Sequence, residues 1–138
     1  MTPGERLSVD ELAVLFSGRT RFVERLADRE NPLEVAGEVV RELSDEEKAE
    51  ALAAHPRIGE PSPEQRGGGE ALLAELERLN RAYEERFGFR FVVFVDRRPR
   101  SAIVPILRER LRRTREQELD TAVQELVAIA RDRWTRTT

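Results

Sequence analysis

The chain contains a single histidine, His55, within the stretch "HPRIGEPSPEQ" at residues 55–65. Imidazole titrates near neutral pH, so His55 is the first candidate for proton transfer. Pro56 ends the helical pattern that leads into it, because the residue before a proline is pushed out of the α region. At a helix C-terminus the dipole favours imidazolium, and we expect the break in the backbone to expose the ring. A single histidine is more often a surface or packed residue, and that interpretation stays open.

Glu64 and Gln65 follow on the same loop, with Glu64 nine residues after His55. A carboxylate close to an imidazole fixes its tautomer and supports its protonated form. The pair suits proton transfer, although "HP" followed by "EQ" also occurs by chance.

Arg133 is the second candidate, because it lies on the inward side of the last helical pattern. The apolar positions of that pattern are Leu119, Ala122, Val123, Leu126, Ala130 and Trp134. At about 100° per residue, Arg133 lies within roughly 60° of the centre of this face, whereas Arg131 and Asp132 point away. A buried guanidinium must be paired. Its partner is either a neighbouring glutamate or a carboxylate-bearing ligand, which a planar guanidinium can grip with two bonds.

Residues 97–115 form a basic run, "RRPRSAIVPILRERLRRTR". It contains no lysine and no stacking aromatic residue, so it is a weak nucleic-acid signal. We interpret it as a solvated helix face, with RNA binding as the alternative.

Metal and phosphate sites are not indicated. With one histidine and no cysteine, the chain has no ligand set for a metal ion. The "GGG" at residues 67–69 lacks the Lys-Ser/Thr of a phosphate-binding loop.

The elements that must position these residues are helical. Capping boxes at Ser8 and Ser44 start two helices, and Asn31 followed by proline starts another. The clearest helix spans residues 70–88, with Gly88 as its C-terminal cap, and two more cover residues 101–113 and 115–134. The segment "FRFVVFV" has strand-like composition, but a lone strand has no partner for its amides. We therefore expect a short buried connector.

Length and composition fit one domain, residues 1–138, that folds as a compact all-α bundle with one long polar loop. The chain is 39% apolar and 37% charged, with a net charge of −3. This charge predicts no general attraction to nucleic acid or to an anionic membrane. No apolar run approaches a membrane span, and "MTPGERLSVDEL" has no apolar signal-peptide region, so we expect a cytoplasmic protein.

Five stretches in order then resemble one family. They are "AHPRIG", "SPEQ", "LNRAYEERFGFRFVVFV", "RPRSAIVPILRERL" and "ELDTAVQELVAIARDRW". Together they resemble the 2-oxo-4-hydroxy-4-carboxy-5-ureidoimidazoline (OHCU) decarboxylases, from about Ala54 to Trp134. That family completes the conversion of urate to (S)-allantoin, a step of purine degradation.

The resemblance implies an all-α homodimer that needs no cofactor and acts on a small ureidoimidazoline. It implies that His55, Glu64 and Arg133 are catalytic. Residues 61–65 would form the substrate loop and residues 91–95 a pocket wall that presents backbone groups to the ring. The substrate-binding positions implied by the resemblance are Pro56, Pro61, Ser62, Pro63, Gln65, Phe91, Val92, Val93, Phe94 and Val95.

The chain departs from the family pattern in four places. The loop between "HP" and "EQ" is shorter, Pro61 stands where the family has serine, with Ser62 one position nearer to Glu64, and Arg90 stands where the family commonly has proline. An "RPF" pattern is absent around "DRENPL". These departures leave an altered substrate open. The alternative function is a non-catalytic helical interaction module, in which Arg133 forms a structural ion pair.

Overall fold

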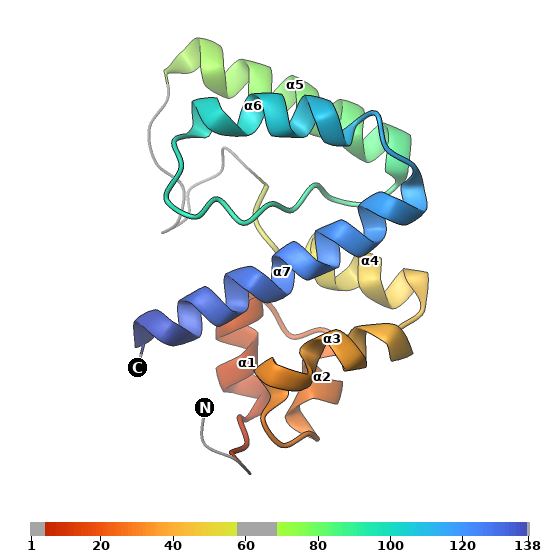
Figure 1. Cartoon of the computed structure of the whole chain (residues 1–138), viewed down its shortest axis with the longest axis vertical. Coiled ribbons are helices and arrows are strands. Elements are labelled where there is room, and N and C mark those ends of the chain that lie inside the picture. Colours follow the sequence, from red (N-terminus) through yellow and green to blue (C-terminus); the bar gives the residue numbers. More distant parts are fainter. Residues whose placement is uncertain (1–4, 58–68, 138) are drawn as a thin grey trace.

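The computed structural model describes residues 5–57 and 69–137 of the chain, and within them it contains helices and no strand (Figure 1). The helices are α1 (Val9–Phe16), α2 (Arg21–Ala27), α3 (Pro32–Glu42), α4 (Asp45–Ala53), α5 (Glu70–Phe87), α6 (Arg100–Arg110) and α7 (Arg115–Thr137). The all-α class predicted from the sequence is confirmed.

Both predicted capping boxes form. The Ser8 hydroxyl accepts from the Glu11 amide at 3.1 Å, and the Glu11 carboxylate accepts from the Ser8 amide at 3.0 Å. Ser44 and Glu47 repeat the arrangement at the start of α4. Each box satisfies two amides that a helix start leaves without intrahelical partners. Local sequence therefore defines where α1 and α4 begin.

Helix ends also follow local sequence. Gly88 ends α5 with a φ of +78°, a left-handed conformation that glycine adopts without steric cost. At the start of α3, Asn31 takes φ +50° and Pro32 is the first helical residue, as expected, but the Asn31 side chain makes no capping bond. The proline geometry therefore starts α3 without help from a side-chain cap.

Helix α7 is the central element of the fold. It packs against α1, α3 and α4, and α2 packs in turn against α1, α3 and α4. Helices α5 and α6 lie side by side on the other side of α7 (Figure 1). The two helix groups therefore meet along α7.

Residues 88–99 run back beneath α5 and α6 to the start of α6, between that pair and α7 (Figure 1). Residues 91–95 have no regular secondary structure, and Phe91, Val92, Val93 and Val95 are at most 5% exposed. The predicted buried connector is confirmed, and we call residues 88–99 the connector.

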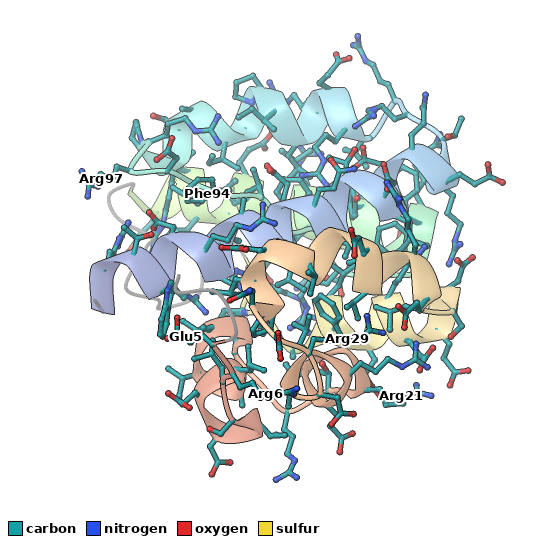
Figure 2. All side chains as sticks on the ribbon, turned by 60° about the horizontal axis from the view of Figure 1, so that its bottom comes forward. Glu5, Arg6, Arg21, Arg29, Phe94 and Arg97 are labelled. Atoms are coloured by element: carbon teal, nitrogen blue, oxygen red, sulfur yellow. The ribbon has the colours of Figure 1, made fainter. Side chains whose placement is uncertain are left out.

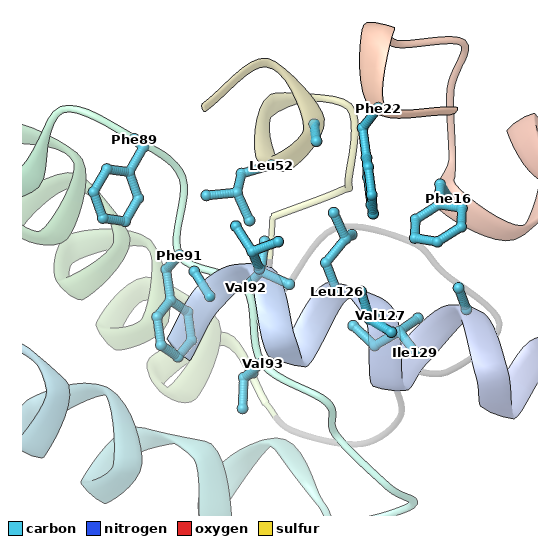
Figure 3. Close-up of a cluster of buried hydrophobic side chains, with 14 of the residues drawn as sticks. Phe16, Phe22, Leu52, Phe89, Phe91, Val92, Val93, Leu126, Val127 and Ile129 are labelled. Atoms are coloured by element: carbon cyan, nitrogen blue, oxygen red, sulfur yellow. The ribbon is translucent and has the colours of Figure 1, made fainter. Parts of the chain in front are cut away.

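One hydrophobic core joins all of these elements. Figure 3 shows Val92 of the connector between Leu52 of α4 and Leu126 of α7. Fully burying one such side chain stabilises the fold by about 1.5–3 kcal/mol. The connector is thus held by its own apolar side chains rather than by sheet pairing.

Charged side chains cover the outside (Figure 2). Several form ion pairs, such as Arg21 of α2 with Glu50 of α4 at 3.2 Å and Arg29, between α2 and α3, with Glu42 of α3 at 2.7 Å. These pairs are exposed, so water and salt screen them and each contributes little to stability.

Candidate active site

His55 lies two residues beyond the last residue of α4. Its amide donates to the Leu52 carbonyl at 3.1 Å, which closes the last turn before Pro56. The residue is only 7% exposed, so the expectation of an exposed ring is wrong. The end of α4 packs closely against the turn that follows α1, which consists of Ser17 and Gly18 and which we call the α1 turn. A Cβ added at Gly18 would lie 2.9 Å from the Ala54 Cβ. A buried imidazole is therefore held in a defined environment, as proton transfer requires.

Arg90 of the connector contacts the backbone around His55. Its Nη1 donates to the Ala53 carbonyl at 2.7 Å and to the His55 carbonyl at 2.6 Å. The last carbonyls of a helix lack intrahelical partners, and a guanidinium satisfies them well. The arginine that departs from the family pattern thus joins the connector to the end of α4.

Arg57 fixes the chain on the other side of Pro56. Its Nε and Nη2 donate to the two carboxylate oxygens of Glu84 on α5, at 2.8 and 3.0 Å. Such a two-bond pair also fixes the relative orientation of its members. The bonds from Arg57 hold the pKa of the Glu84 carboxyl below its ordinary value, and the charge of Arg90 adds to this effect.

We expect the Glu84 carboxylate to stabilise the fold in a pH-dependent way. Because its folded pKa is lowered, this stability is fully present above the ordinary glutamate pKa near 4.3. It is lost as the pH falls from there through the lower folded value. The pair is half exposed, so Glu84→Gln costs at most about 1 kcal/mol at pH 7.

The measurement is urea unfolding of wild type and Glu84→Gln at pH 7 and pH 3, with Glu85→Gln as the exposed control on the same helix. The difference between wild type and Glu84→Gln should shrink at pH 3. A difference that stays constant over this range would contradict the pairing.

Arg133 reaches from α7 to the end of α1. Its Nη1 donates to the Leu15 carbonyl at 3.0 Å and to the Ser17 hydroxyl at 2.7 Å, and the residue is half-buried. Ser17 precedes Gly18, which touches Ala54 next to His55. The α1 turn thus connects Arg133 to the end of α4. Two bonds of Arg133 therefore go to neutral acceptors at the end of α1, a kind of partner that the sequence analysis did not consider.

Arg131 and Asp132, which were expected to point away from the protein, only partly do so. Arg131 is exposed, but its Nε donates to the Leu33 carbonyl at 2.9 Å, so it contacts α3. Asp132 is half-buried and pairs with Arg136 at 2.8 Å. Arg136, which is exposed, is therefore a better control for Arg133 than Arg131.

The backbone of residues 91–95 is bonded to the protein at several points. The Val92 carbonyl accepts from Arg110 at 2.7 Å, and the Phe94 amide donates to Glu125 at 3.3 Å. Arg98 donates to the carbonyls of Val95 and Phe94. The bonds to Arg110 and Glu125 attach the connector to α6 and α7, and its apolar side chains lie mainly in the core.

Sequence reasoning missed a buried ionic network beside the connector. Glu118 is fully buried, and its carboxylate accepts from Arg110 at 2.6 Å, Tyr83 at 2.7 Å and Arg113 at 2.9 Å. Burial, followed by the bond to Glu118, raises the pKa of the Tyr83 hydroxyl. The same argument from helical spacing that placed Arg133 on an inward face could have shown that Arg110 is buried. Arg110 follows Ile103 and Leu107 on the buried side of α6.

The interpretation of residues 97–115 as a solvated face is therefore wrong for Arg110. This side chain is 6% exposed, because it points between α6 and α7 to reach Glu118. Arg108 and Arg115 are exposed, but each also bonds within the protein, Arg108 to Glu75 and Arg115 to the Phe87 carbonyl. Much of the basic run thus serves internal pairing.

Five of the predicted site residues, Pro61, Ser62, Pro63, Glu64 and Gln65, lie outside the described residues. Pro56 is described and half-buried next to His55. Of the three expected catalytic residues, the structure therefore describes His55 and Arg133 only.

Within residues 5–57 and 69–137, no group of three or more His, Cys, Asp or Glu side chains could hold a metal ion. None of the helices in this part of the chain is long and apolar enough to span a bilayer.

Comparison with known proteins identifies the family. The family model of OHCU decarboxylase matches residues 8–135. The chain belongs to the OHCU decarboxylase family. This confirms the resemblance inferred from the sequence motifs.

Two curated relatives agree with this membership in the OHCU decarboxylase family. A 2-oxo-4-hydroxy-4-carboxy-5-ureidoimidazoline decarboxylase of Haloferax volcanii is 34% identical over 104 residues, 66% of this chain and 61% of that protein. A uric acid degradation bifunctional protein of a Bacillus species is 30% identical over 105 residues, 67% of this chain and 21% of that protein. The alignments therefore span less than two thirds of these relatives' lengths.

Solved structures share the fold. A crystal structure of OHCU decarboxylase in the presence of (S)-allantoin superposes with a TM-score of 0.81 at 23% identity, covering 92% of this chain and 96% of that one. A crystal structure of (S)-allantoin synthase gives 0.70 at 24% identity, covering 91% of this chain and 47% of the other. The helical architecture of the OHCU decarboxylase family is thus present over nearly the whole chain.

Proposed function

We propose that this protein is a carboxy-lyase that converts OHCU to (S)-allantoin in urate degradation, without a metal or organic cofactor. The observation that carries the proposal is the chain's only histidine. It is buried at the end of α4 and bonded through its carbonyl to the connector, inside the region that matches the OHCU decarboxylase family.

The chemistry needs no external electron acceptor. When the bond between the ring carbon and its carboxylate breaks, CO2 leaves and the electron pair moves into the ring, where the adjacent imine nitrogen accepts electron density. The imine nitrogen takes up a proton from solvent, the ring hydroxyl loses its proton as a carbonyl forms, and a proton is delivered to the neighbouring ring carbon. The protein must therefore move protons and orient the substrate.

Each of the three proposed catalytic residues has one task. His55 takes the proton from the ring hydroxyl, and Glu64 holds the imidazole or the substrate in place. Arg133 grips an electron-rich edge of the ligand. Delivery of a proton to one face of the ring then gives the S product.

The remaining residues bind the substrate. We assign residues 61–65 to a loop over the ligand, Pro56 to a contact beside His55, and residues 91–95 to the pocket wall.

The direct test is decarboxylation of OHCU generated freshly from urate, because the compound also decays spontaneously. Circular dichroism of the allantoin formed reports both rate and handedness. We expect enzyme-dependent formation of the S enantiomer, unchanged by EDTA. Racemic allantoin formed at the spontaneous rate would refute the function.

Arg133→Met should reduce the rate by about 10²-fold, on the scale of losing one charged transition-state contact. Loss of the bonds to the Leu15 carbonyl and the Ser17 hydroxyl should cost the fold only about 1–3 kcal/mol, because both acceptors are neutral. The measurement pairs thermal unfolding with the decarboxylation rate.

Arg136→Met is the matched control for Arg133, since Arg136 is exposed on the same helix. It should leave both rate and stability nearly unchanged. A large loss of stability in Arg133→Met, with near-normal activity in the folded protein, would assign Arg133 a structural role instead.

We also propose that the protein is a cytoplasmic homodimer that binds neither nucleic acid nor membranes. The family resemblance supports the dimer, and the net charge of −3 supports the absence of polyanion binding. Light scattering coupled to size exclusion measures the oligomeric state, and a mass near 15.9 kDa would refute the dimer.

A further inference from the structure

The two bonds made by Arg90 are directed at one turn of the backbone. Both acceptors, the carbonyls of Ala53 and His55, belong to the end of α4, and both lie within 2.7 Å of the same nitrogen, Nη1. Carbonyls at a helix C-terminus carry partial negative charge, which a guanidinium offsets. Arg90 therefore stabilises one particular conformation of the peptide units around His55.

The backbone of Arg90 is itself fixed. Its two chain neighbours, Phe89 and Phe91, are 4% and 1% exposed. Both rings pack edge-on against Tyr83 of α5, with centroids 5.9 and 5.1 Å apart. Because two core aromatic residues flank Arg90, its backbone is held in place by packing. Its guanidinium can therefore hold the carbonyls at the end of α4 in a fixed position.

A second contact restrains the chain after His55. Arg57, two residues on, is bonded at two points to Glu84 of α5. The positive charge of Arg90 also contributes to lowering the pKa of the Glu84 carboxyl. The His55–Pro56 pair thus lies between two arginine contacts, one to the preceding carbonyls and one to the following side chain.

We infer that Arg90 is a positioning residue that sets the orientation of the His55 imidazole through the backbone, and so determines its efficiency in proton transfer. The kinetic part of this inference rests on the proposed decarboxylase function. The direction of the Cα–Cβ bond of His55 follows from its backbone, whose carbonyl Arg90 holds at 2.6 Å. Misplacement of a catalytic group by about 1 Å can cost a hundredfold in rate.

The kinetic test compares Arg90→Met, which removes the donors and keeps an apolar stem, with Arg90→Lys, which retains a positive donor. We expect kcat of Arg90→Met to fall by about tenfold to a hundredfold, with KM within about twofold of wild type. Arg90→Lys should recover part of kcat, since an ammonium can still donate to these carbonyls. Arg112→Met, an exposed arginine beyond α6, is the control and should match wild type.

A spectroscopic test does not depend on activity. His55 is the only histidine, so the imidazole signals in a ¹H–¹³C NMR spectrum belong to it alone. In Arg90→Met these signals should shift and broaden as the ring samples more than one orientation. In Arg112→Met they should stay where they are in wild type.

The two tests distinguish a positioning role of Arg90 from a purely structural or binding role. An unchanged kcat per folded molecule, or a raised KM with unchanged kcat, overturns the inference, as do unchanged imidazole signals in Arg90→Met. If Arg90→Met fails to fold, Arg90→Gln replaces it in both tests. If wild type does not decarboxylate OHCU, the proposed function fails, while the NMR comparison still decides whether Arg90 orients His55.

Discussion

Replacing His55 by alanine or glutamine is expected to lower the decarboxylation rate by about 10²–10⁴-fold, the usual contribution of a general acid or base. His55 is the only group in the chain whose ordinary side chain titrates near pH 7, so no other residue can take over its task. The measurement is allantoin formation by circular dichroism, corrected for spontaneous decay of OHCU.

The fold of these His55 variants should persist. Two bonds at this turn use the backbone amide and carbonyl of His55, and both remain after substitution. Far-ultraviolet circular dichroism and a thermal midpoint check this. A folded His55→Gln protein with a near-normal rate would refute the proton-transfer role and, with it, the mechanism proposed above.

Glu118→Gln is expected to destabilise the protein by about 3–5 kcal/mol, the usual cost of breaking a buried ion pair. Glu118 is fully buried, and the side chain of its partner Arg110 is 6% exposed. Glutamine has nearly the same shape, but it leaves the Arg110 guanidinium as an uncompensated charge in the core. Because Arg110 also bonds the Val92 carbonyl, the connector should loosen as well.

Urea unfolding at pH 7 measures the loss, and Glu116→Gln serves as its control. Glu116 is exposed on the same helix, and its substitution should change stability by less than about 0.5 kcal/mol. The double variant Arg110→Met with Glu118→Leu should be more stable than Glu118→Gln, because it removes both buried charges. A loss below about 1 kcal/mol for Glu118→Gln would contradict the importance of the pair.

The sequence alone determined the helices and the first candidate for catalysis. Capping boxes, a glycine at φ +78° and a proline after His55 act within a few residues of the helix ends they define, so their effect can be read locally. Because "FRFVVFV" is the only strand-like segment in the sequence, it also indicated a buried connector rather than a sheet. The resemblance of the motifs to OHCU decarboxylases was confirmed by the family match.

The tertiary structure alone decided which of the many arginines and glutamates pair. The chain has 24 basic and 27 acidic residues, so composition permits very many pairings. Arg90 with His55 and Tyr83 with Glu118 are each 35 residues apart, and their contact depends on how α5, α7 and the connector pack. Helical phase can show that a charge faces inward, but not which partner it meets. The burial of His55 has the same origin, because the close approach of Gly18 to Ala54 joins two helix ends whose sequences carry no common signal.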